Sequence, residues 1–201
     1  MFAQSGKRPA IVHTPEKSTI HVPPQEAPES LTKIYGNLGS KTDLYNDMAG
    51  WGVSGPASRV NNSEFVALPF TPKVNAHVSQ ARVAIQYGGF GANQINLSLY
   101  GETNGAPGTL LAGPVTVTNL PFSGTCCTLA IATFSPVAVT AGTQYWIVAD
   151  TPLSGTGSDF LGYWKVVAKP VFEVAFNAGE TGWFANDADL LAAGEVLGTV
   201  P

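Results

Sequence analysis

The segment Gln94–Tyr100 reads QINLSLY, and its pattern decides the fold. Isoleucine and leucine alternate with polar residues, which is the period-two pattern of a strand that buries one face. Similar runs recur after about residue 35, for example Val115–Thr118 and Gln144–Ala149, separated by Gly, Pro or Asn. Only Asp187–Val196 has a mildly helical pattern, which a glycine cuts short. Because short strands joined by turns are typical of sandwiches, we predict an all-β fold, an antiparallel jelly-roll-like β-sandwich.

The same alternation predicts which side chains share the core. Leu97 and Leu99 should lie on one face of their strand, since residues two apart in a strand point the same way. In the run QYWIVA, we expect Ile147 to enter the same core together with Tyr145 or its neighbour Trp146.

Composition excludes several classes of protein. The 201 residues include 10 basic and 14 acidic side chains, a net charge of −4, which argues against a nucleic-acid partner. No apolar run approaches the roughly 20 residues of a membrane span. Hydrophobic residues make up 44% of the chain, so it can bury a sizeable core.

The distribution of charge favours an extracellular or cell-surface location. Glu102 is the only charged residue between Val83 and Ala149, and Thr, Ser, Asn and Gln supply the polar faces there. Cytosolic surfaces usually carry Lys and Glu instead. The opening residues MFAQSG lack the pattern of a secretory signal, so we expect either a mature form or no export by that route. After Lys169 the chain carries acidic residues and no basic ones.

Residues 1–34 differ from the rest of the chain and are predicted to form an extended arm before a domain at 35–201. Five prolines in this stretch forbid a long helix and favour extended backbone. We expect the arm to pack along another subunit or an open sheet edge; folding back on its own sandwich is the alternative. The apolar residues that would dock are Ile11, Val12, Ile20 and Val22.

The segment Ile95–Asp150 carries a set of motifs found together in one known family. They are the turn NGAPG at 104–108, the run FSP at 134–136 and the strand AGTQYWIV at 141–148. Over roughly Ser63 to Phe184, the chain resembles the choice-of-anchor R type of domain in secreted or surface-attached bacterial proteins. The resemblance implies a jelly-roll-like sandwich, exported and without known catalysis.

Catalytic motifs are absent from the sequence, so we do not expect an enzyme. No nucleophile elbow is present, and the sandwich centre offers only Glu102, Asp150 and Asp159 as acids. No zinc-ligand spacing and no organic cofactor motif appear. The oxygen-rich stretches 43–47 and 186–189 leave a structural calcium ion as an open alternative.

Cys126 and Cys127 are neighbours in a predicted strand. Because successive strand side chains point to opposite faces, we expect one buried thiol and one thiol on the other face. A disulfide between the two, or one to another chain, stays an open alternative.

Aromatic residues suggest a second kind of function. Sugar-binding sandwiches present aromatic rings beside amide and carboxylate groups, and the candidate ligand-binding residues here are Tyr163, Trp164 and Trp183. The alternative interpretation is that such rings have a purely structural role in the core.

The leading hypothesis is a non-catalytic structural or adhesive module that acts through protein–protein contacts, as part of a homo-oligomer or a larger surface assembly. The alternatives are a carbohydrate-binding module and a structural subunit of a virion or appendage.

Overall fold

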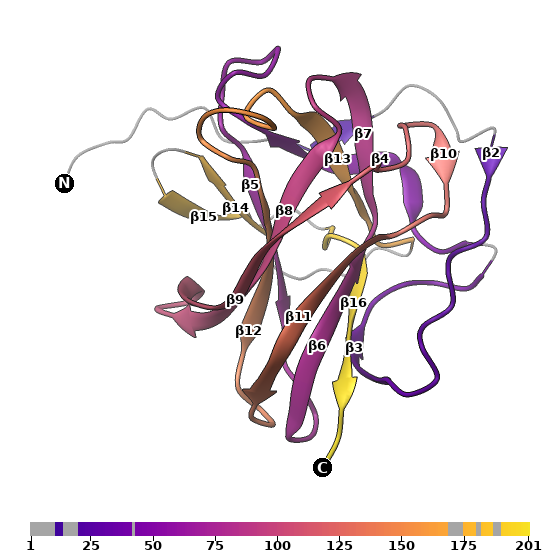
Figure 1. Ribbon diagram of the computed structural model, residues 1–201, viewed down its shortest axis with the longest axis vertical. Helices are drawn as coiled ribbons and strands as arrows, with labels where there is room; N and C mark the ends of the chain where they lie inside the picture. Colours follow the sequence, from indigo (N-terminus) through magenta and orange to yellow (C-terminus); the bar gives the residue numbers. More distant parts are fainter. Residues whose placement is uncertain (1–10, 14–19, 42, 169–174, 180–181, 187–189) are drawn as a thin grey trace.

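The computed structural model describes residues 11–13, 20–41, 43–168, 175–179, 182–186 and 190–201 (Figure 1). Every regular element among them is a strand, so the predicted all-β fold is confirmed. The helical expectation for 187–196 is wrong for the part described, because β16 begins at Gly194. No helix among the described residues is long and apolar enough to cross a membrane.

One layer of the molecule is a six-stranded antiparallel sheet. Its order is β15 (Gly182–Asn186), β14 (Ala175–Gly179), β5 (Phe65–Phe70), β12 (Tyr145–Asp150), β8 (Gln94–Thr103) and β9 (Ala106–Thr118). The segment Gln94–Tyr100 therefore lies in β8, which pairs with β12 on one side and β9 on the other.

Two four-stranded sheets form the other layer. One has the order β11 (Ala130–Val139), β6 (Ala76–Val83), β16 (Gly194–Thr199) and β3 (Thr32–Gly36). The other has the order β1 (Ile11–His13), β4 (Asn46–Ser54), β13 (Leu161–Val166) and β7 (Ile85–Phe90). Ala84 alone separates β6 from β7, so one stretch of chain runs from the first sheet into the second.

The main core lies between the two layers. It contains Leu97, Leu99, Tyr145 and Ile147 from the six-stranded sheet, as predicted. Side chains from the opposing sheets complete it, including those of Trp51, Val78, Val83, Trp164 and Val196. Trp146 points to the other face of its strand, yet it is also fully buried.

Two short parts of the arm pair with strands of its own chain, whereas residues 22–31 are described but form no strand. β1 pairs with the edge of β4, and β2 (Ile20–His21) pairs in parallel with β10 (Thr125–Cys126). The expected boundary at residue 34 falls inside β3, and Ile34 belongs to the main core. The sandwich thus begins a few residues earlier than predicted, while packing of the arm against another subunit stays a prediction.

Candidate interaction surfaces

The outer face of the six-stranded sheet carries an apolar cluster that the main core does not use. Ala67, Trp146 and Val148 are buried there, and Tyr100 and Trp183 pack against them while remaining partly exposed. Trp146 lies directly across from Tyr100 in the strand register. The alternation of β12 explains the arrangement, because Trp146 and Val148 face away from Tyr145 and Ile147.

A row of polar groups continues the same face. Asp150, Asn96 and Thr116 lie side by side on β12, β8 and β9. Asn96 Nδ2 donates to Asp150 Oδ1 at 3.2 Å, and Thr116 Oγ1 donates to Asn96 Oδ1 at 3.0 Å. The face therefore offers aromatic carbon beside groups that can donate and accept hydrogen bonds.

Burial shifts the pKa of two titratable side chains on this face, Asp150 and Tyr100. It raises the pKa of Asp150 to about 6, against the opposing effect of the hydrogen bond from Asn96. Burial also raises the pKa of Tyr100, and the nearby charge of Asp150 adds to that effect. With a pKa of about 6, Asp150 changes charge within a mildly acidic range.

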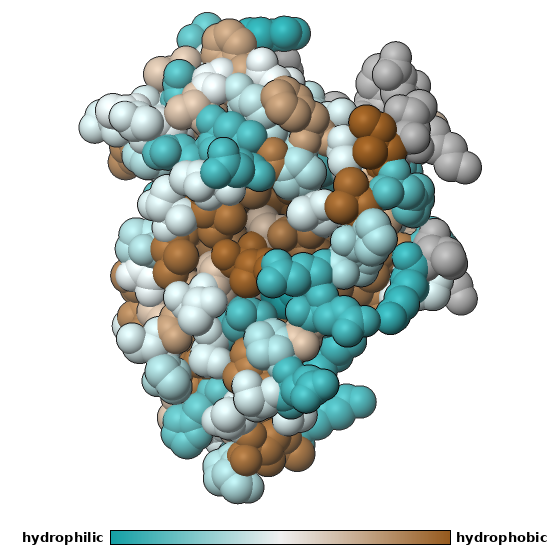
Figure 2. Space-filling model, turned by 45° about the vertical axis from the view of Figure 1, so that its right-hand side comes forward, coloured by the Kyte–Doolittle hydropathy of each residue, from teal (hydrophilic) through white to brown (hydrophobic). Residues whose placement is uncertain are grey.

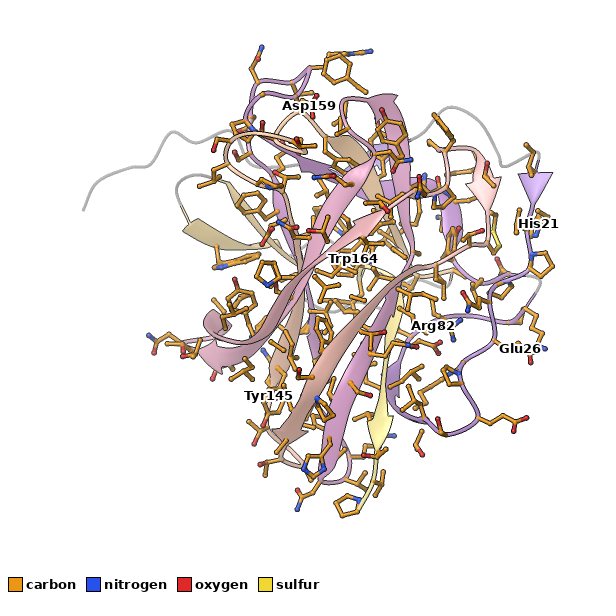
Figure 3. All side chains as sticks on the ribbon, in the orientation of Figure 1. His21, Glu26, Arg82, Tyr145, Asp159 and Trp164 are labelled. Atoms are coloured by element: carbon orange, nitrogen blue, oxygen red, sulfur yellow. A yellow bond between two sulfur atoms is a disulfide. The ribbon has the colours of Figure 1, made fainter. Side chains whose placement is uncertain are left out.

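The three predicted ligand-binding aromatics do not form one site. Trp183 lies on the outer face just described, whereas Tyr163 and Trp164 belong to β13 in the other layer. Trp164 as a surface ligand-binding residue is wrong: its side chain is fully buried (Figure 3) and its indole N–H donates to the carbonyl of Ala193 at 2.9 Å. Tyr163 is half-buried, with Lys165 Nζ 5.5 Å from its ring centroid.

The described arm leaves apolar side chains in solvent. Ile20 is 58% exposed and Val22 is 40% exposed. Backbone hydrogen bonds hold this part of the arm: Val22 N–H donates to the carbonyl of Cys126, and Cys127 N–H donates to that of Val22 at 2.8 Å. The side chains of Ile11 and Val12 lie outside the described part of the structure.

Phe122 adds to the apolar surface near the arm. It is 60% exposed, and its carbonyl accepts a hydrogen bond from Thr125, the residue that pairs with Ile20. We call Ile20, Val22 and Phe122 the arm patch. Figure 2 turns this side of the molecule forward, and apolar atoms lie exposed at its upper right.

Cys126 and Cys127 are joined by a disulfide, so the expectation of two separate thiols on opposite faces is wrong. The reason is local: β10 has only two residues and ends at Cys126, so strand alternation does not extend to Cys127. Both cysteines belong to one small buried cluster with Leu44, Tyr45 and Leu129.

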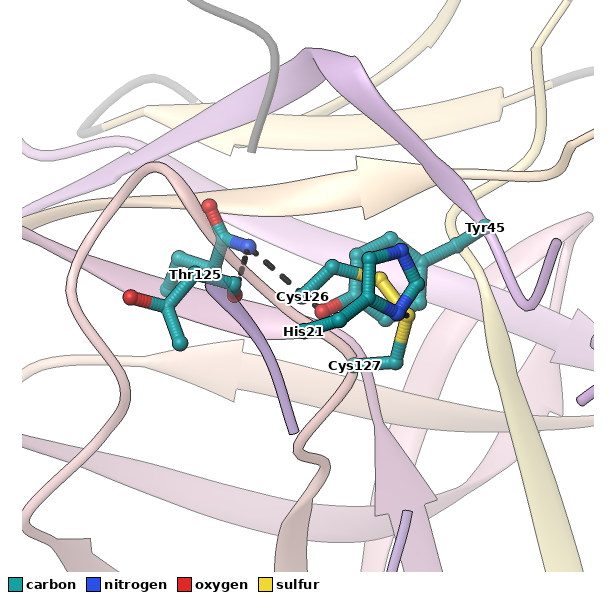
Figure 4. The surroundings of a disulfide bond; sticks show 6 residues. His21, Tyr45, Thr125, Cys126 and Cys127 are labelled. Carbon is teal, nitrogen blue, oxygen red and sulfur yellow. Dashed lines mark hydrogen bonds between the residues drawn. A yellow bond between two sulfur atoms is a disulfide. The ribbon is translucent and has the colours of Figure 1, made fainter. Parts of the chain in front are cut away.

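His21 of the arm lies over this disulfide (Figure 4). Its Nδ1 is 3.9 Å from Cys127 Sγ. Among the residues that the structure describes, His21, Cys126 and Cys127 form the one group of three side chains able to ligate a metal ion. Asp43 and Asp47, considered above for calcium, belong to no such group, and the stretch 186–189 lies largely outside the described residues.

Comparison of the chain with models of known families and with curated proteins finds no match. The resemblance to choice-of-anchor domains thus stays a prediction.

Proposed function

We propose that the protein is a non-catalytic structural subunit of a surface assembly and that it works through protein–protein contacts made by its arm side. The observation that carries this proposal is the arm patch. β2 is attached by backbone hydrogen bonds while Ile20 and Val22 remain exposed.

Two physical arguments support a partner at this surface. Ordering an extended segment costs roughly 1 kcal/mol or more per residue in backbone entropy, and a two-residue strand with exposed side chains offsets little of it. Exposed apolar side chains gathered in one place are also typical of interaction sites. A second copy of the chain that covers the arm patch would bury these side chains.

A surface location agrees with the same picture. Disulfides persist in oxidising compartments. The two cysteines of this chain form a disulfide with each other. The charge-poor polar faces and the resemblance to choice-of-anchor domains support an extracellular role as well.

The mass of the protein in solution tests the proposal. We expect the full chain to form an oligomer in sedimentation equilibrium, and we expect the double variant Ile20→Asp, Val22→Asp to be monomeric. Leu153→Asp is the matched control because Leu153 is 70% exposed and lies in the loop after β12. A full-length chain that stays monomeric at every concentration would contradict the proposal.

The outer face supports a second candidate, carbohydrate binding. Tyr100 and Trp183 offer ring surface beside the hydrogen-bonded row of Asn96, Asp150 and Thr116, which suits the apolar faces and hydroxyls of a sugar. Binding on a glycan array that is lost in Trp183→Ala but retained in Tyr163→Ala would favour this candidate. Equal binding by both variants would count against it.

A further inference from the structure

We propose that Cys126, Cys127 and His21 form a redox-gated site for a thiophilic metal ion, Zn²⁺, that is closed in the disulfide state and opens on reduction. Metal binding at this site does not depend on whether the protein forms the assembly proposed above.

The three side chains already lie close enough to share one ion. All their ligand atoms are within 4.8 Å of one another, and Cys127 Sγ is 3.9 Å from His21 Nδ1. Tetrahedral zinc has Zn–S bonds of about 2.3 Å and Zn–N bonds of about 2.0–2.1 Å, which place neighbouring ligand atoms roughly 3.5–3.8 Å apart. His21 Nδ1 is already near this spacing from Cys127 Sγ, and breaking the S–S bond frees the two sulfurs to move apart to it.

The backbone holds the imidazole in place beside the sulfurs. His21 pairs with Cys126 in the parallel strands β2 and β10. Hydrogen bonds between Val22 and the two cysteines lie directly beside this pair, one in each direction. A ligand placed by strand pairing loses little further freedom when the ion binds.

The burial of the group also suits a metal. Cys126 and Cys127 are 4% and 1% exposed, whereas His21 is exposed. The sulfurs thus face away from solvent, and the imidazole lies on the solvent side, where an ion can enter. Two thiolates and one imidazole favour zinc over calcium or magnesium, and they leave a fourth position for water.

The site would form in two steps, reduction of the disulfide and then binding of the ion. A dithiol reductant transfers two electrons and two protons to the disulfide; the S–S bond breaks, two thiols form and the reductant becomes a disulfide. Zn²⁺ then binds two thiolates and the Nδ1 lone pair of His21, in the tautomer that carries its proton on Nε2, and the two thiol protons pass to solvent.

Bound metal would also fasten the arm to the body. His21 belongs to the arm, whereas the cysteines belong to the sandwich domain. In the reduced state the site therefore adds metal–ligand bonds to the backbone hydrogen bonds that join the arm to the body at β2 and β10.

Zinc and cobalt binding by the full-length protein tests the proposal. After reduction by a phosphine, which does not compete as a thiol, we expect one Zn²⁺ per chain. Co²⁺ should give thiolate-to-cobalt charge-transfer absorption that Zn²⁺ abolishes. The oxidised protein should bind neither ion at this site. Circular dichroism of the reduced protein checks that the β-fold persists.

Variants distinguish the three-ligand site from simpler explanations. Cys127→Ser should reduce the charge-transfer band by at least half, and His21→Ala should weaken Zn²⁺ binding by at least about tenfold. His77→Ala, which removes an exposed histidine of β6, is the control and should bind as the parent does. Equal metal binding by oxidised and reduced protein, or unchanged affinity in His21→Ala, would overturn the proposal.

Discussion

Arg82 Nη1 lies 2.7 Å from Glu195 Oε1, and both side chains are buried where β6 pairs with β16. Lys33 of β3 reaches the other carboxylate oxygen at 3.1 Å. Glu195, one of the acidic residues that follow Lys169, thus joins three strands of one sheet.

Replacing Glu195 should strongly destabilise the fold. Glu195→Gln leaves the Arg82 guanidinium buried without its counter-charge, and such a loss costs about 3–5 kcal/mol. Chemical denaturation measures the effect. The control is Glu26→Gln, which removes the exposed pair between Glu26 and Lys41 and should cost under about 1 kcal/mol. Similar losses in both variants would show that the buried pair has no special role.

Leu97→Ala should reveal how tightly the core is packed. Leu97 is fully buried between the layers, so we expect a loss of about 2–5 kcal/mol in the free energy of unfolding. Leu153→Ala, at an exposed position, should change little. A loss below about half a kcal/mol at Leu97 would contradict the register of β8.

Asp150 should make part of the stability depend on pH. Its folded pKa, about 6, is above its usual value, so the folded state holds the proton more tightly than the unfolded state. Stability from this group is full below about pH 4 and falls as pH rises toward 6. Asp150→Asn should therefore be more stable than the parent above pH 6, by on the order of 1–2 kcal/mol after allowance for partial exposure.

Denaturant titrations of parent and Asp150→Asn at several pH values check this prediction. The difference between the two proteins isolates the one carboxyl from all other titrating groups. A difference that does not vary between pH 4 and 7 would be incompatible with the burial described for Asp150.

The disulfide predicts a simple thiol count. The native protein should show no thiol to an alkylating reagent even after unfolding, and two thiols after reduction. Peptide mass spectrometry should find both alkylated cysteines in one peptide, since they are neighbours. Two alkylated cysteines without prior reduction would restore the interpretation as free thiols.

Local alternation was enough to predict the inner face of the six-stranded sheet. Leu97 and Ile147 belong to runs in which every second side chain enters the main core, Ile95, Leu97 and Leu99 in β8 and Tyr145, Ile147 and Ala149 in β12. The failure at Cys127 has the same origin, because the rule requires a strand that continues and β10 stops at Cys126.

The outer face could not be predicted in this way. Asn96, Asp150 and Thr116 lie on three strands, and only the register between those strands brings them together. Trp146 was equally hard to place, because alternation puts it outside the main core and only a second cluster explains its burial. Trp164 was expected in a binding site because neighbouring aromatics in a strand do not reveal which ring faces inward.

The position of β16 determines when β3 can pair during synthesis of the chain. β16 lies between β6 and β3 in its sheet, so residues 32–36 reach their place only after residues 194–199 have been synthesised. During translation β3 leaves the ribosome before its partner strand β16 has been made. Its backbone hydrogen-bonding groups therefore stay without that partner until residues 194–199 have been added. Pairing across so long a separation is slow, because the loop must close before the contacts form. Nascent chains stalled before residue 194 should therefore be protease-sensitive at β3, whose partner strand is β16, while β6 and β11 can already pair with each other.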